Sequence, residues 1–153
     1  MTAFVLVTGS RFLPADGLLP ATLDALAAEL CEHLMVVHGQ CDPRHPDTKR
    51  VIRWDRAGDC GIHPDRLLGA DWQAHRWALS AGHPTDPRPA DWTRFGRAAG
   101  PLRNQRMVDV LADVPHRLVM AYPVGSSAGT MDCVRRAKAA GIPVRVFESG
   151  GAP

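Results

Sequence analysis

Short apolar runs alternate along this chain with longer stretches in which apolar residues recur at helical spacing. An apolar run bounded by turn residues is typical of a buried strand. The runs predict strands at Ala3–Thr8, Leu34–His38, Arg117–Tyr122 and Pro143–Phe147, with a weaker one within His83–Pro89. The last of these ranges is rich in proline, which suits only an edge strand or a loop.

Helical patterns separate the predicted strands. Leucines and alanines at positions 23 to 34 recur every three or four residues and predict a helix over Ala21–Leu34. Further helices are predicted around Asp71–Ala81, from Pro101 onward, and over Thr130–Ala140, which Gly141 ends as a C-cap. This alternation predicts a Rossmann-like α/β fold, doubly wound, with a mainly parallel five-stranded sheet. Ligands of such sheets bind at the carboxyl ends of the strands.

The turn after the predicted strand Arg117–Tyr122 carries the chemistry that most suggests a ligand. It reads PVGSSAGTMD and leads directly into a helix. The first backbone N–H groups of a helix have no intrahelical partner and, with the helix dipole, favour an anion, most often a phosphate. Upstream lies a run of arginines with no acid between Asp91 and Asp109, namely Arg94, Arg97, Arg103 and Arg106. Together these features predict a site for a phosphate-bearing ligand.

Several candidate residues also have plainer interpretations. Ser10 and Arg11 could have a structural role alone, capping a helix or covering a surface. Asp71 could likewise serve merely as a cap of the helix that follows it. Arg103 is the best candidate for the phosphate, because a guanidinium can make bidentate contacts. Trp92 stands beside the arginine run and is the tryptophan to test as a base-stacking platform. His38, at a strand end, is interpreted as a structural histidine.

Four motifs, in this order, resemble the YspA-like branch of the SLOG superfamily, which is related to the Lonely guy (LOG) phosphoribohydrolases. They are TGSR at 8–11, GAD at 69–71, AAGPLRNQRM at 98–107 and GTMD at 129–132. The resemblance implies a nucleotide-binding domain over residues 1–148, a homodimer, and an insertion at about 42–68 where the family usually has only a few residues. Residues 149–153 are expected to form a disordered tail. The ligand-binding residues it implies are Gly9, Ser10, Arg11, Gly39, Asp71, Asn104, Gly125, Ser126, Ser127, Gly129 and Thr130.

The same resemblance implies catalytic roles for Arg103 and Asp132. However, the Lonely guy pattern GTxxE has its acid three residues after the threonine, where this chain has Cys133. One residue along a helix turns a side chain by about 100°. The preferred interpretation is therefore a domain that binds a nucleotide or nucleotide-derived phosphate ligand, as a sensor or a ligand-processing domain. The alternative is an N-glycosidic hydrolase of nucleoside monophosphates or related nucleotides, and a third is an interaction module with a vestigial pocket.

Composition and short motifs restrict the partners, the cellular location and the cofactors to be expected for this protein. The formal charge of +2 is too small to suggest a nucleic-acid partner. Four cysteines without a CxxC pair, and no signal peptide or long apolar run, predict a cytoplasmic protein with reduced thiols and no membrane partner. No cofactor is expected, since the chain lacks the dinucleotide fingerprint G-x-G-x-x-G and a P-loop. No metal is expected either, although the cluster Cys41, His45, Cys60 and His63 leaves a zinc site open as a second interpretation.

Overall fold

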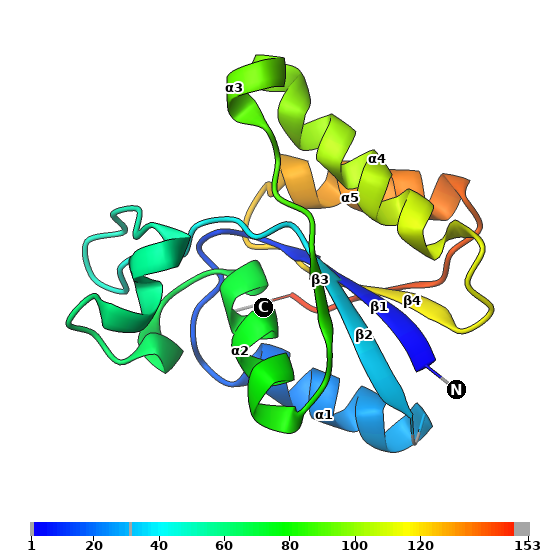
Figure 1. The fold of residues 1–153 in the computed structure, drawn as a ribbon, viewed down its shortest axis with the longest axis horizontal. Helices are drawn as coiled ribbons and strands as arrows, with labels where there is room; N and C mark the ends of the chain where they lie inside the picture. Colours follow the sequence, from blue (N-terminus) through cyan, green and yellow to red (C-terminus); the bar gives the residue numbers. More distant parts are fainter. Residues whose placement is uncertain (1, 31, 149–153) are drawn as a thin grey trace.

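The computed structural model describes residues 2–30 and 32–148 of the chain, and the predicted tail at 149–153 lies outside this range. Its centre is a five-stranded sheet of order β3-β2-β1-β4-β5, in which every pairing is parallel (Figure 1). The strands are β1 (Thr2–Gly9), β2 (His33–His38), β3 (Thr85–Pro87), β4 (Arg117–Tyr122) and β5 (Val144–Val146). The predicted Rossmann-like α/β fold is confirmed, and β2, β1 and β4 are the three central strands.

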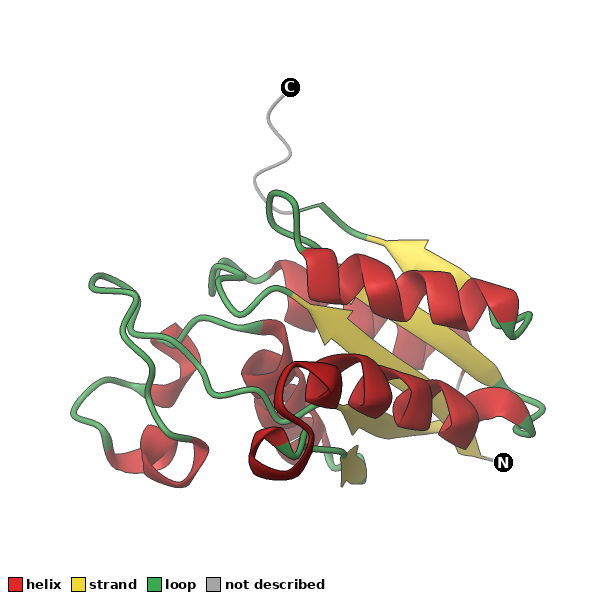
Figure 2. Ribbon diagram, turned by 90° about the horizontal axis from the view of Figure 1, so that it is seen from above, coloured by secondary structure: helices red, strands yellow, loops and turns green. Residues whose placement is uncertain are grey.

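Helices cover both faces of the sheet (Figure 2). One face packs against α1 (Leu18–Leu30) and α2 (Ala70–Ala81), and the other against α4 (Ala99–Ala112) and α5 (Ala128–Ala139). Successive side chains of a strand point to opposite faces. In β1, accordingly, Val5 and Val7 belong to the core under α1 and α2, while Leu6 belongs to the core under α4 and α5. Burial on both faces explains why these strands are almost continuously apolar.

The prediction for the first helix was wrong about where the helix ends. It was expected to run over Ala21–Leu34, but α1 ends at Leu30 and β2 begins at His33. Leu34 is fully buried and pairs with Ala3 of β1, so its apolar character serves the sheet and not the helix. A buried leucine fits either period, and only the strand pairing distinguishes them.

The edge strands are shorter than predicted. β3 has three residues within the range His83–Pro89, and β5 has three within Pro143–Phe147. Each pairs with one neighbour only, β3 with β2 and β5 with β4. Pro87 is tolerated in β3 because an edge strand leaves one side of its backbone without a ladder. In the described part of the chain, no helix combines the length and apolar character needed to cross a bilayer.

The segment 42–68 folds beyond the carboxyl ends of β1 and β2 (cyan to green in Figure 1). It contains two short 3-10 helices, Trp54–Asp59 and Pro64–Arg66, and a small core of its own made by Ala57, Leu67 and Trp72. Arg44 forms isolated antiparallel β-bridges with Val51 and with Leu68, which connect the start of the segment to its middle and its end. Trp72 of α2 supplies apolar surface that this segment lacks, and the segment packs against it.

The structure gives the cysteine and histidine side chains of this segment local partners. The Cys60 thiol lies 3.6 Å from the carbonyl oxygen of Ala57, and the His45 and His63 rings accept backbone N–H bonds within their own turns. Among residues 2–30 and 32–148, no group of three or more His, Cys, Asp or Glu side chains is placed to hold a metal ion.

His38 connects the end of β2 to this segment. Its ring is fully buried, stacks on Trp54 with centroids 5.5 Å apart, and lies 3.2 Å from His75 between Nε2 and Nδ1. Its Nδ1 accepts a bond from the N–H of Gln40 at 3.1 Å, so the proton of the neutral ring is on Nε2. The interpretation of His38 as a structural histidine agrees with this geometry.

Burial lowers the pKa of His38 from 6.5 to about 4, with a smaller contribution from His75 in the same direction. In the unfolded chain the ring takes up a proton below about pH 6.5, whereas the folded protein resists it. We therefore expect the contribution of His38 to the free energy of unfolding to be constant above about pH 6.5. It should fall by about 3 kcal/mol as the pH drops toward 4. His38→Asn, which keeps an acceptor for Gln40, should show a smaller loss of unfolding free energy over this window in urea titrations. Equal pH slopes in the two proteins would contradict the assignment.

Candidate functional site

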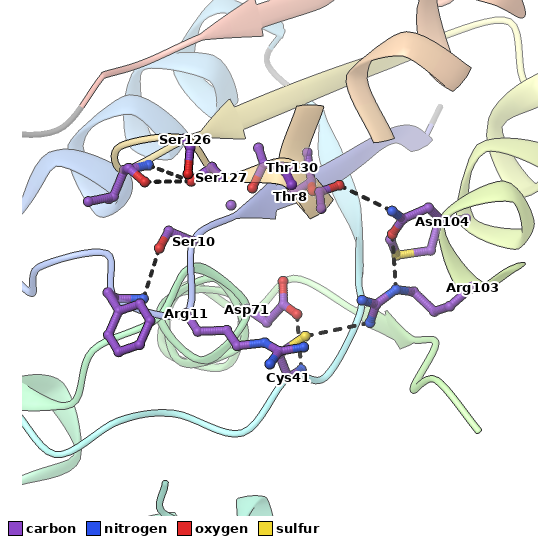
Figure 3. Close-up of a pocket in the computed structure, with 16 residues that line it drawn as sticks. Thr8, Ser10, Arg11, Cys41, Asp71, Arg103, Asn104, Ser126, Ser127 and Thr130 are labelled. Atoms are coloured by element: carbon purple, nitrogen blue, oxygen red, sulfur yellow. Dashed lines mark hydrogen bonds between the residues drawn. The ribbon is translucent and has the colours of Figure 1, made fainter. Parts of the chain in front are cut away.

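A pocket of about 380 Å³ opens at the carboxyl ends of β1 and β4 (Figure 3). This is the edge at which parallel α/β sheets bind ligands. Ten of the predicted site residues line it: Gly9, Ser10, Arg11, Asp71, Arg103, Asn104, Ser126, Ser127, Gly129 and Thr130. They come from four segments far apart in the sequence, which the parallel sheet brings to one place.

The Gly/Ser turn between β4 and α5 forms one wall. Ser127 closes the turn, since its hydroxyl accepts from the N–H of Val124 and donates to the carbonyl of the same residue, both at 2.8 Å. Gly125 has a φ of +61°, a left-handed conformation that glycine adopts without strain. Gly125 shapes the turn but is absent from the pocket lining. Because α5 begins at Ala128, the amides of its first turn lie at this wall.

Arg103 of α4 forms the facing wall and is held in place by three contacts. Its Nη1 donates to the carbonyl oxygen of Gly39 at 2.7 Å and lies 3.6 Å from the Cys41 sulfur. Its Nε donates to Oδ1 of Asn104 at 3.1 Å. Within the described residues, Nη2 has no hydrogen-bond partner. The guanidinium is thus fixed in orientation while retaining donors for a ligand.

The other three arginines of the run lie outside this lining. Arg94 and Arg106 place their guanidinium groups over the ring of Phe95, and Arg97 is exposed in the short 3-10 helix Gly96–Ala98 before α4. A second cation comes instead from Arg11, which lines the pocket from the end of β1 and extends toward Cys41 (Figure 3). Next to it, the Ser10 hydroxyl accepts a bond from the N–H of Phe12 at 3.0 Å.

Asp132 lies outside the pocket lining, on the surface between α4 and α5. Its carboxylate accepts from Arg136 at 2.9 Å and from Nδ2 of Asn104 at 3.0 Å. Partial burial opposes ionisation, but the bonds from Arg136 and Asn104 lower the pKa of Asp132 below its ordinary value. The same Asn104 amide donates to the carbonyl of Gly129 at 3.2 Å. Asp132 therefore orients Asn104, and through it Arg103, without facing the pocket.

Asp71 is the carboxylate that does line the pocket. It stands in the first turn of α2 and is almost fully buried, but it makes no cap for that helix. Its Oδ2 accepts instead from the N–H of Cys41 at 3.0 Å. This bond joins the start of α2 to the chain just after β2.

Cys41 belongs to the lining although it was not among the predicted site residues. Burial, followed by the charge of Asp71, raises the pKa of its thiol to about 11, so the thiol is neutral at physiological pH. Its position three residues beyond the predicted strand end at His38 was a signal that could have identified it. Gly39, the remaining predicted residue, borders a neighbouring pocket and lies directly beneath Arg103. The sequence reasoning also missed the further lining residues Thr8, Phe12, Met107, Val124 and Ala128.

Comparisons with known proteins give one strong relationship. The Gene 61 protein of Mycobacterium phage D29 is 46% identical over 151 residues, covering 94% of this chain and 94% of that protein. No protein-family model matches the chain. Two crystal structures of the C-terminal domain of the PF1911 hydrogenase from Pyrococcus furiosus are 13% identical, with TM-scores of 0.42 and 0.40. They cover 95% and 94% of this chain, and the chain covers 91% and 89% of theirs. A likeness at this level carries no argument about function.

The close approach of Arg103 to Gly39 gives a prediction. A Cβ at Gly39 would lie 2.7 Å from Cζ of Arg103, which is too close, but the neighbour is the end of a flexible side chain. Gly39→Ala should therefore fold, lose about 1.5–3 kcal/mol with the charged hydrogen bond, and show a displaced Arg103 in a crystal structure.

Gly9→Ala is the comparison variant. There a Cβ would meet the backbone oxygen of Tyr122 at 2.8 Å and the Cβ of Ala70 at 2.5 Å, neither of which can move away easily. It should lose more than about 3 kcal/mol or fail to fold, since overpacking in a rigid core is costly. An unmoved Arg103 in Gly39→Ala would contradict the role assigned to this glycine.

Proposed function

The chain belongs to the family of the Gene 61 protein of Mycobacterium phage D29, and we propose that it binds a nucleotide or nucleotide-derived phosphate ligand. The pocket at the carboxyl end of the sheet is the proposed site. The observation that carries this proposal is the pairing of a preformed helix N-terminus with a fixed arginine across one pocket. The two groups are the first turn of α5 and the guanidinium of Arg103.

The phosphate is assigned to the space between these two walls. The α5 amides and the helix dipole supply one set of donors, and the free donors of Arg103 supply another. Arg11 adds a second positive charge from the end of β1. Thr130, at the start of α5, lines the same wall and adds a hydroxyl. Charge-assisted contacts of this kind contribute roughly 1.5–3 kcal/mol each.

The sugar of the ligand is assigned to Asp71. A carboxylate beside a phosphate site repels the anion unless it faces a neutral part of the ligand, and ribose hydroxyls are natural donors to it. This arrangement favours binding over turnover, because Asp132, the acid implied for catalysis, is turned away and neutralised by Arg136. The protein is then a sensor or a carrier of its ligand. Hydrolysis of the N-glycosidic bond, the second candidate function, would have to use Asp71, the carboxylate that lines the pocket.

The positions of the four motifs support membership of the YspA-like branch of the SLOG superfamily. TGSR contributes Ser10 and Arg11, GAD contributes Asp71, AAGPLRNQRM contributes Arg103 and Asn104, and GTMD contributes Gly129 and Thr130. All four motifs therefore meet at one pocket, as motifs retained for a common ligand would. A cytoplasmic homodimer belongs to the same proposal and remains a prediction.

Removal of Arg103 tests the phosphate site. Arg103→Ala should weaken the binding of a nucleoside monophosphate more than tenfold in calorimetry, because the loss of about 1.5 kcal/mol or more corresponds to that factor. Arg106→Ala is the matched control, since Arg106 is an exposed arginine of the same helix and lies outside the pocket lining. Unchanged affinity in Arg103→Ala, with its fold intact, would place the ligand elsewhere.

A product assay distinguishes binding from hydrolysis. We expect the wild-type protein to return nucleoside monophosphates intact after prolonged incubation, with no free base detected by mass spectrometry. If free base is released, and Asp71→Asn abolishes the release while Asp132→Asn does not, the protein is a hydrolase that uses Asp71. If Asp132→Asn alone abolishes the release while its affinity for the nucleotide is unchanged, Asp132 itself acts in the reaction and its placement outside the pocket is wrong.

A further inference from the structure

A second pocket adjoins the first and shares part of its wall. It has a volume of about 490 Å³ and is lined on the shared side by Arg11, Cys41 and Arg103. Its other walls come from the segment 42–68 and from the stretch between β3 and α3 (Trp92–Phe95). We call this space the second lobe, and its remaining lining residues are Gly39, Gln40, Asp42, Arg44, Val51, Pro89, Ala90 and Trp92. The two spaces adjoin at these three shared side chains.

Trp92 is the most prominent side chain of the second lobe. It is the first residue of α3, is 50% exposed, and its turn is held by Asp91, which accepts from the N–H of Arg94 at 3.0 Å. The ring packs over Gly100, where an added Cβ would lie only 3.3 Å from it. Arg11 places its guanidinium 5.9 Å from the ring centroid. An aromatic side chain that lines a pocket and is half exposed is a usual platform for a nucleic acid base.

The wall contributed by the segment 42–68 carries groups suited to the edge of a base. Arg44 is fixed by backbone bonds with Leu68, and its guanidinium lies over Phe12 at 5.3 Å. Its Nε is buried and, within the described residues, has no hydrogen-bond partner. Asp42 accepts from the N–H of Trp54 at 2.8 Å, which orients its carboxylate. A donor and an acceptor on one wall match the mixed donor and acceptor pattern of base edges.

We propose that the second lobe holds the base of a nucleotide whose phosphate occupies the first pocket. The proposal rests on the function proposed above, because the phosphate anchors the ligand. Arg11 and Arg103 stand at the junction of the two spaces, and Asp71 lies on the first-pocket side of it, where the ribose would pass. The ligand class is then a nucleotide recognised through its base, not a sugar phosphate. The segment 42–68 is the element that gives this chain its base selectivity.

The experiment compares ligands that differ only by the base. The affinities of the wild-type protein for AMP, GMP, CMP and UMP are measured by calorimetry beside that for ribose 5-phosphate. At least one nucleotide should bind about tenfold or more tighter than ribose 5-phosphate, since stacking of one base on an aromatic side chain is worth a factor of this order. Equal affinities for all five ligands would overturn the inference.

Variants of Trp92 test whether the base of the nucleotide lies on this side chain. Trp92→Ala should lose about tenfold or more in affinity for the preferred nucleotide and change the affinity for ribose 5-phosphate less than twofold, while Trp92→Phe should retain most of the nucleotide affinity. Leu102→Ala, at an exposed apolar residue of α4 outside both pockets, is the matched control and should change neither. If Trp92→Ala weakens both ligands equally, the base does not lie on Trp92 and the inference fails, although the phosphate site stands. If Arg103→Ala leaves both affinities unchanged, the proposed function itself fails.

Discussion

The hydrogen bond between the Arg103 guanidinium and the carbonyl oxygen of Gly39 organises the functional edge of this protein. It joins α4, on one face of the sheet, to the end of β2, and it requires a residue without a side chain at position 39. Burial works against the charge of Arg103, but the nearby Cys41 and Asp71 favour it, and the carbonyl oxygen of Gly39 and the amide oxygen of Asn104 fix the orientation of the guanidinium. A cation fixed by the protein's own atoms loses little freedom when an anion arrives, and this preorganisation favours tight binding.

Two aspartates near this arginine have different tasks. Asp132 belongs to a chain of bonds that runs from Arg136 through Asn104 to Arg103 and ties α5 to α4. Asp71 instead faces the pocket and accepts a backbone bond from the loop after β2. A substitution at either position would disturb the site, but for separate physical reasons. Loss of Asp132 loosens the support of the cation, whereas loss of Asp71 removes a charge from the pocket itself.

The segment 42–68 shows how a charged, proline-rich stretch can fold without a large core of its own. Trp54 stacks on His38 at the end of β2 and meets Trp72 of α2 edge to face at 5.0 Å. These contacts connect the segment to the sheet and to the helix that carries Asp71. The segment is therefore held rigidly enough to form one wall of the second lobe. Its arginine and aspartate side chains can then face a ligand in a defined geometry.

The amino-acid sequence was enough to predict the α/β architecture and most of the residues that line the first pocket. Apolar runs flanked by turns define β1, β2 and β4, and a Gly/Ser turn before a helix predicts an anion site, because both depend on interactions between neighbours in the chain. Three other features depend on the folded arrangement of the chain. Leu34 belongs to β2 because its partner Ala3 lies in another strand, and Asp132 faces away because Arg136 and Asn104 hold it there. The second lobe exists because a distant segment folds over Trp72, bringing Arg44 and Trp92 to one cleft. Such choices depend on partners that are remote in sequence, and periodicity and local motifs contain no information about those partners.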